Sequence, residues 1–325
     1  MTELTGESGA LRLAAGGAPR ALVLAGDGEA VHASPMLSAL AGRHSPCPVI
    51  RLGPGPLPNW VGAVDLVVVA SLGRDRDPEL ALLTDAAARR GAALLGVGRA
   101  GSALHERCTW ARAPFVAVPA ERSEGTALWS LLTPILMLAV ELRIIEDGLD
   151  GTASALDAMA ELCRPDSESF VNPAKLLALQ LHLTLPLLVS DSVATAVVAD
   201  RLRSQLARMV GILAAPAPLP EALEEASAYL TGALAPAAAE RDIFRDREAD
   251  APQELRILTV RDAATYADRA HEAMRELVRR AEYAGVPVTE LTAEEADRLG
   301  RLAALIALGD FACVYLRLLL SDLKR

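Results

Sequence analysis

The chain has 325 residues, a net charge of −10 at pH 7, 52% hydrophobic residues and only 3% aromatic residues. This composition excludes a largely disordered chain and fits α/β domains with cores of Ala, Leu and Val. The acidic charge disfavours nucleic acid and anionic membranes as partners. A small anionic ligand remains compatible with it, because local arginines and helix N-termini can hold a phosphate.

The N-terminal residues 1–18 are predicted to be a flexible tail, since they lack the basic start and apolar core of a secretory signal. The most apolar runs, 128–140 and 176–189, are interrupted by Pro134 and Pro186 and fall short of the roughly 20 residues that span a bilayer. We therefore expect a cytoplasmic protein without a membrane span.

The cysteines have neither metal-ligand spacing nor the context of an exported protein: Cys47, Cys108, Cys163 and Cys313. We interpret them as reduced thiols that act as small core hydrophobes, and we expect no metal site.

Three apolar runs in the first half predict buried parallel strands, at residues 21–25, 65–69 and 92–96. Residues 77–90 predict a crossover helix between the last two strands, because Pro78 stands at its start and apolar residues follow on one face. These elements form a β-α-β unit.

The second half repeats this plan, with predicted strands at residues 185–189, 255–260 and 285–288 and a helix at 264–284. A helical bridge over 128–146 precedes it, and a helix restarts at Asn172-Pro173, where Asn caps the helix and Pro occupies its first turn.

The repeat predicts two tandem α/β domains, each with three αβα layers around a parallel sheet. We place the first domain at 19–151, a linker at 152–171 and the second domain at 172–325. An extra, Pro-containing segment at about 208–254 separates the first two strands of the second half, where a site could be built.

Two strand-end loops of the first half are candidate ligand sites, because parallel sheets bind ligands beyond the carboxyl ends of their strands. The first loop carries Gly26 and Gly28, which allow a backbone to approach a phosphate closely. It is only the beginning of a dinucleotide fingerprint, since Val31 stands at the third glycine position. We therefore predict no NAD and no other cofactor.

The second loop offers the hydroxyl of Ser71 and the guanidinium of Arg74 next to a predicted helix start. This arrangement would cradle a sugar phosphate. The alternative is a solvated turn between strand and helix, because Asp27 and Asp75 oppose an anion.

Three stretches carry a resemblance to a known family: 172–178, 242–262 and 309–316. On these the chain resembles the bifunctional phosphoglucose/phosphomannose isomerases, which contain two tandem sugar-isomerase (SIS) domains. The resemblance implies SIS-type folds and a homodimer whose site is completed across two chains. It also implies hydroxyl-rich phosphate loops after the first two strands, and here both loops have lost most of those hydroxyls.

The resemblance implies a carboxylate base and a histidine at two positions that the segment Leu219-Pro220-Glu221 fixes in register. Counted from that segment, the base position falls on Arg208 and the histidine position on Glu224. A guanidinium stays protonated, with a pKa above about 12, so Arg208 cannot accept a carbon-bound proton. We therefore expect a pseudoenzyme in which aldose-ketose isomerase activity is lost or altered.

Two other functions remain open. In one, Glu224 serves as the base of an active isomerase and Arg208 steadies the enediolate, although acids after Pro220 also suit the first turn of a helix. In the other, the chain is a non-catalytic scaffold for a sugar-nucleotide pathway. No histidine is assigned a role, since none has a nucleophile or metal partner in sequence. Our leading hypothesis is a protein that binds a sugar phosphate or a related metabolite.

Overall fold

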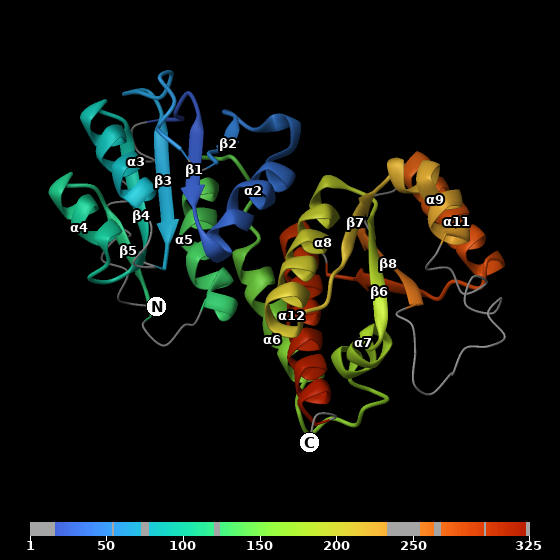
Figure 1. Ribbon diagram of the computed structural model, residues 1–325. Helices are drawn as coiled ribbons and strands as arrows, with labels where there is room; N and C mark the ends of the chain where they lie inside the picture. The colour runs from blue at the N-terminus through green and yellow to red at the C-terminus, as the bar shows by residue number, and fades with distance from the viewer. Residues whose placement is uncertain are drawn as a thin grey trace. The chain divides into compact units, whose positions relative to one another are not determined.

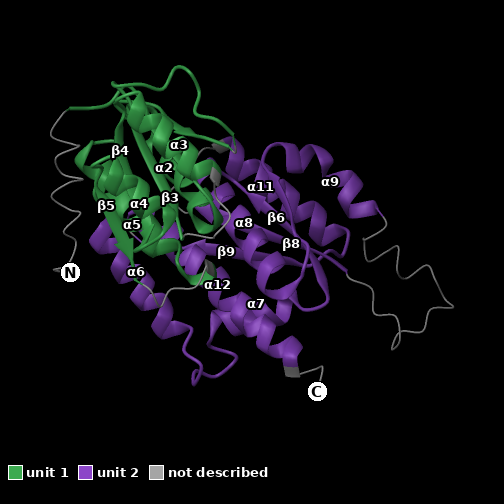
Figure 2. Cartoon of the chain, turned by 60° about the vertical axis from the view of Figure 1, so that its left-hand side comes forward, with its two compact units in different colours: residues 1–147 green, residues 148–325 purple. Residues whose placement is uncertain are grey.

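The computed structural model describes residues 17–53, 55–72, 78–119, 124–232, 254–262, 268–295 and 297–322. The chain divides into two compact units, residues 1–147 and 148–325 (Figure 2). Each unit contains one parallel sheet with helices on both faces (Figure 1), which confirms the predicted fold class.

The first unit is built on a sheet with the strand order β2-β1-β3-β4-β5, in which all neighbours are parallel. Its strands are β1 Leu22–Gly26, β2 Val49–Arg51, β3 Leu66–Ser71, β4 Ala93–Arg99 and β5 Phe115–Val118. Its helices are the 3-10 turns η1 Gly28–His32, η2 Gly42–His44 and η3 Glu124–Thr126, with α2 Ala33–Ala41, α3 Pro78–Arg89, α4 Ala103–Trp110 and α5 Leu128–Glu141.

The second unit is built on a sheet with the order β7-β6-β8-β9, again entirely parallel. Its strands are β6 Thr184–Ser190, β7 Ala215–Pro218, β8 Glu254–Asp262 and β9 Val288–Ala293. Its helices are α6 Leu149–Leu162, α7 Pro173–Leu181, α8 Val193–Gln205, α9 Glu221–Thr231, α11 Asp268–Tyr283 and α12 Arg298–Asp322, with a single π turn, η4 Leu206–Val210, after α8.

Strand alternation explains the layers. In β8, Leu255 and Ile257 pack on the side of α9 and α11, together with Met274 and Leu277 of α11. The opposite face carries Leu258, which is also fully buried, and there the sheet packs against α8 and α12. A central strand buried on both faces requires a nearly continuous apolar run, which is the signal that the sequence carries.

Several predicted boundaries differ from the structure. The helical bridge ends at Glu141 instead of residue 146. Residues 149–162, partly inside the predicted linker, form α6, which packs against α12 within the second unit. The last strand begins at Val288 rather than 285, because Gly285 at φ +71° first closes the end of α11 with a hydrogen bond from its N–H to the Glu282 carbonyl.

The sequence analysis missed the short edge strands β2, β5 and β7, of three or four residues each. One described helix, at Arg298–Ser321, is long and apolar enough to cross a membrane by length and composition, although the analysis expected no such segment. It is largely buried against α6, α7 and α8, so packing inside the unit accounts for its apolar character.

An ion pair between the half-exposed Arg20 and the buried Asp65 fixes the start of β3. Arg20 donates from Nε to Asp65 Oδ1 at 2.9 Å and from Nη2 to Oδ2 at 2.6 Å, and the Gly62 N–H donates to Oδ2 at 2.9 Å. Burial raises the pKa of Asp65, but these hydrogen bonds outweigh it and hold the pKa below its ordinary value.

Replacing Asp65 by Asn should therefore destabilise the protein by about 1–2 kcal/mol near neutral pH, where the wild-type carboxylate is ionised. A depressed pKa contributes stability that is lost as the pH falls through the native value. Urea unfolding of the wild type and the variant over a pH series should show their difference in unfolding free energy shrinking below pH 3.8, the ordinary pKa of an aspartic acid. A difference that does not change with pH would contradict this assignment.

Candidate functional site

The strand order determines where a ligand would bind in each unit. In the first unit the chain leaves β1 for β2 on one side and returns to β3 on the other, and in the second it leaves β6 for β7 and returns to β8. In sheets of this order, ligands bind beyond the carboxyl ends of the strands where the crossovers diverge. The candidate regions are therefore the β1/β3 ends of the first unit and the β6/β8 ends of the second.

The two predicted glycines lie at the β1/β3 ends but have different reasons to be glycine. A Cβ on Gly26 would lie 2.6 Å from the Ala70 carbonyl oxygen of β3 and 2.8 Å from the Ala30 Cβ, so packing alone forbids a side chain there. Gly28 has open space around it but a φ of +53°, which L side chains rarely adopt. Gly26 thus lets η1 fold back closely on β3.

Ser71 ends β3 and is buried, directly after Ala70, which pairs with Gly26. The structure therefore brings Ser71 and Gly26 to the same strand ends, as the sequence analysis expected. Arg74 lies outside the described residues. The binding roles of Gly26, Gly28, Ser71 and Arg74 stay predictions.

Sequence reasoning missed a buried acid and a buried imidazole on η1. Glu29 is 1% exposed and His32 is 3% exposed, and they lie three residues apart on a 3-10 turn, where such residues share a face. This spacing is visible in the sequence, although the periods sought there belong to α-helices and strands.

Arg208 and Glu224, the two positions assigned to lost catalytic residues, are both exposed. Arg208 lies on the π turn η4, and Glu224 lies in the first turn of α9 with Glu221. Acids in a first turn stabilise the helix dipole, which is the structural interpretation considered above. A carboxylate in water also lacks the desolvation that tunes a general base.

A buried polar cluster lies on α8 just before Arg208. Arg201, 1% exposed, donates from Nη2 to Asp310 Oδ2 of α12 at 3.0 Å, and the Gln205 amide donates to Oδ1 at 3.1 Å. Burial raises the pKa of Asp310 even though Arg201 and Gln205 act to lower it. This cluster holds α8 against α12, and the exposed Arg208 of the following π turn lies outside it.

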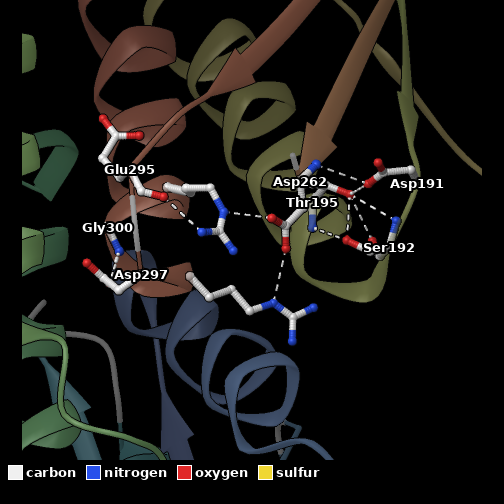
Figure 3. A network of polar contacts seen from close by, with 9 residues as sticks. Asp191, Ser192, Thr195, Asp262, Glu295, Asp297 and Gly300 are labelled. Atoms are coloured by element: carbon white, nitrogen blue, oxygen red, sulfur yellow. Dashed lines mark hydrogen bonds and ion pairs between the residues drawn. The ribbon is translucent and has the colours of Figure 1, made fainter. Parts of the chain in front are cut away.

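A second network occupies the β6/β8 ends of the second unit (Figure 3). Asp191, just after β6, accepts at Oδ1 from Thr195 Oγ1 at 2.9 Å and from the N–H of Asp262 at 3.4 Å. Asp262, the last residue of β8, accepts from Arg301 Nε at 2.8 Å and from Arg298 Nε at 3.2 Å. The start of α12 is thereby tied to the end of the central strand.

Burial raises the pKa of Asp191, and the charge of Asp262 raises it further against the hydrogen bond from Thr195. The sequence analysis inspected strand-end loops only in the first half and so missed both acids. The signal was available, because Asp191 directly follows β6 and Asp262 is the last residue of β8, each after an apolar run. A carboxyl with a raised pKa at such a position is typical of a functional site.

Other chemistry has little support among the residues that the structure describes. No group of three His, Cys, Asp or Glu side chains there could hold a metal ion. All four cysteines are free and buried, and burial raises the pKa of Cys108 and of Cys313 to about 12, so neither thiol is a nucleophile near neutral pH.

Comparison with protein families finds a match in the second unit. Residues 170–321 match the bacterial phospho-glucose isomerase C-terminal SIS domain. A bifunctional phosphoglucose/phosphomannose isomerase from Caldicellulosiruptor bescii is 29% identical over 153 residues, which are 46% of this chain and 44% of the relative. The match thus spans less than half the length of that relative. It confirms the family resemblance predicted from the sequence.

Solved structures share the fold over nearly the whole chain at low sequence identity. Tagatose-6-phosphate ketose/aldose isomerase from Escherichia coli aligns with a TM-score of 0.67 and 13% identity, covering 98% of this chain and 89% of the other. A glucose-6-phosphate isomerase like protein from Thermus thermophilus aligns with a TM-score of 0.58 and 20% identity, covering 98% and 90%. At such low sequence identity, these similarities show only that the fold is shared.

The importance of the Arg201–Asp310 pair for the packing of α8 on α12 can be tested by mutation. Asp310→Asn should cost about 3 kcal/mol or more of unfolding free energy, because it leaves a buried guanidinium without this counter-charge. Asp200→Asn is the matched control on the same helix, since Asp200 pairs with Arg203 at the surface, and it should change stability by less than about 1 kcal/mol. Equal effects in urea unfolding would contradict the importance of this cluster.

Proposed function

We propose that this protein binds a sugar phosphate through the strand-end loops of its first SIS-type unit, and that its aldose-ketose isomerase activity is lost or altered. We further propose that it works as a cytoplasmic homodimer. The observation that carries the proposal is the match of residues 170–321 to the phospho-glucose isomerase C-terminal SIS domain, combined with the side chains at Arg208 and Glu224.

The binding half of the proposal is supported by the β1/β3 ends of the first unit. There the backbone at Gly26 packs directly against β3, and the hydroxyl of Ser71 lies at the end of that strand. Hydroxyls and backbone N–H groups at such ends are the donors that hold phosphate oxygens. We expect weaker binding than a hydroxyl-rich loop would give, because this loop has lost most of the hydroxyls that the family resemblance implies.

The catalytic half is supported by the chemistry of two side chains. Proton transfer between sugar carbons requires a base of tuned pKa, and a guanidinium cannot accept a proton. Glu224 is a carboxylate, but it lies exposed in the first turn of α9. Neither position therefore supplies the desolvated carboxylate that this reaction needs.

Binding is tested by thermal unfolding with fructose 6-phosphate. At about 100 times its dissociation constant the ligand should stabilise the protein by about 2.7 kcal/mol, and Ser71→Ala should reduce this shift. Ser38→Ala, at an exposed position of α2, is the control and should leave the shift unchanged. If phosphosugars and sugar nucleotides all fail to shift unfolding, binding is refuted and the scaffold alternative gains support.

Activity is tested by following glucose 6-phosphate and mannose 6-phosphate conversion to fructose 6-phosphate. We expect turnover far below that of active isomerases, unchanged in Glu224→Gln because this carboxylate is not the base. Turnover comparable with active isomerases would contradict the proposal. Loss of that turnover in Glu224→Gln without a change in melting temperature would establish Glu224 as the base instead.

A further inference from the structure

The second unit gathers a separate set of polar groups at the carboxyl ends of β6 and β8. Val189 of β6 pairs with Thr259 of β8, and side chains of a strand alternate between faces. Arg261 therefore shares the face of Thr259, on the side of α11. This face is apolar further down, where Leu255 and Ile257 pack. Asp191 follows β6 at the end of the sheet, where its carboxyl accepts from Thr195 of α8 and from the N–H of Asp262.

Arg261 connects three elements at this point. Its Nη1 donates to Glu290 Oε1 of β9 at 2.5 Å, and its Nη2 lies 3.0 Å from His271 Nδ1 in the first turns of α11. Its charge also acts on the neighbouring Asp191 carboxyl. Arg261 is thus placed between a carboxyl group and an imidazole.

The contact with Arg261 determines the tautomer of His271. A guanidinium has only donors, so the Nδ1 atom must accept with its lone pair. The neutral ring then carries its proton on Nε2. His271 consequently presents an N–H donor while its other nitrogen is fixed.

Thr259 is a polar residue where an apolar one would be more stable. It is 0% exposed, and among the described residues its Oγ1 has no hydrogen-bond partner. An unsatisfied buried hydroxyl costs about 1–3 kcal/mol of folding free energy, so Thr259 is not explained by packing of the core alone. Such departures are expected next to functional sites.

Carboxyl groups of this region already have arginine partners. Glu290 is paired with Arg261, the charge of Arg261 also acts on Asp191, and Asp262 is paired with Arg298 and Arg301 of α12. A phosphate dianion would add uncompensated charge beside Asp191 and Asp262. A neutral ligand with hydroxyl donors for the Asp191 carboxylate and an oxygen acceptor for His271 suits the same groups.

We propose that the β6/β8 ends of the second unit form a binding site of their own for an uncharged polyhydroxy compound, such as an unphosphorylated sugar or polyol. Asp191 would accept from ligand hydroxyls, and the Nε2–H of His271 would donate to a ligand oxygen. This site is separate from the phosphosugar site proposed for the first unit, and it does not depend on it.

The probes are D-glucose and sorbitol, with binding followed by NMR titration of the full chain labelled with 15N. Histidine ring correlations should first show the Nε2–H tautomer of His271. Both Asp191→Asn and His271→Gln should weaken the binding of at least one probe about tenfold, the loss expected for one strong hydrogen bond. His182→Gln, at the end of α7, is the control and should leave binding unchanged.

The proposal is overturned if neither probe binds, if the two variants bind as the wild type does, or if His271 carries its proton on Nδ1. Inorganic phosphate that displaces glucose from the same residues would overturn the charge argument. Fructose 6-phosphate binding distinguishes the two sites, because Asp191→Asn should leave it intact. Loss of that binding in Asp191→Asn would show one shared site and contradict the separate one.

Discussion

Parallel pairing of every strand with its neighbours is the constraint on which the rest of this structure depends. Parallel neighbours cannot be joined by a tight turn, so each connection crosses a face of the sheet, and helices bury both faces. The same pairing places all carboxyl ends at one edge. In the first unit β2 and β3 pair on opposite sides of β1, and in the second unit β7 and β8 pair on opposite sides of β6. The connections after these strands diverge, so the carboxyl ends of β1/β3 and of β6/β8 are left open to polar loops.

The interior strands and main helices could be predicted because burial on both faces appears in the sequence as a continuous apolar run. Strand β3 matches its prediction to within two residues at either end. The edge strands could not be predicted, since β2 and β7 have only three or four residues and β7 alternates Ala with Pro. Helix α6 was partly mistaken for a linker because its packing partner, α12, follows about 150 residues later in the chain.

The candidate site was predictable only in part. Gly26 and Ser71 meet because strand pairing dictates it, and both strands were recognisable as apolar runs. The contacts of Arg201 with Asp310 and of Asp191 with Asp262 span 109 and 71 residues, so no local pattern reveals them. Their consequence is a second unit whose polar groups are already tied to one another. Arg208 and Glu224, which the sequence analysis predicted to stand at catalytic positions, lie at the surface.

We propose that a sugar phosphate binds at the β1/β3 ends of the first unit and that its isomerisation is lost or altered. A crystal structure of the protein soaked with fructose 6-phosphate would test both parts at once. We expect an unreacted ligand with its phosphate near Ser71 and the Gly26 loop. A phosphate bound elsewhere, or a ligand converted to an aldose in the crystal, would contradict the proposal.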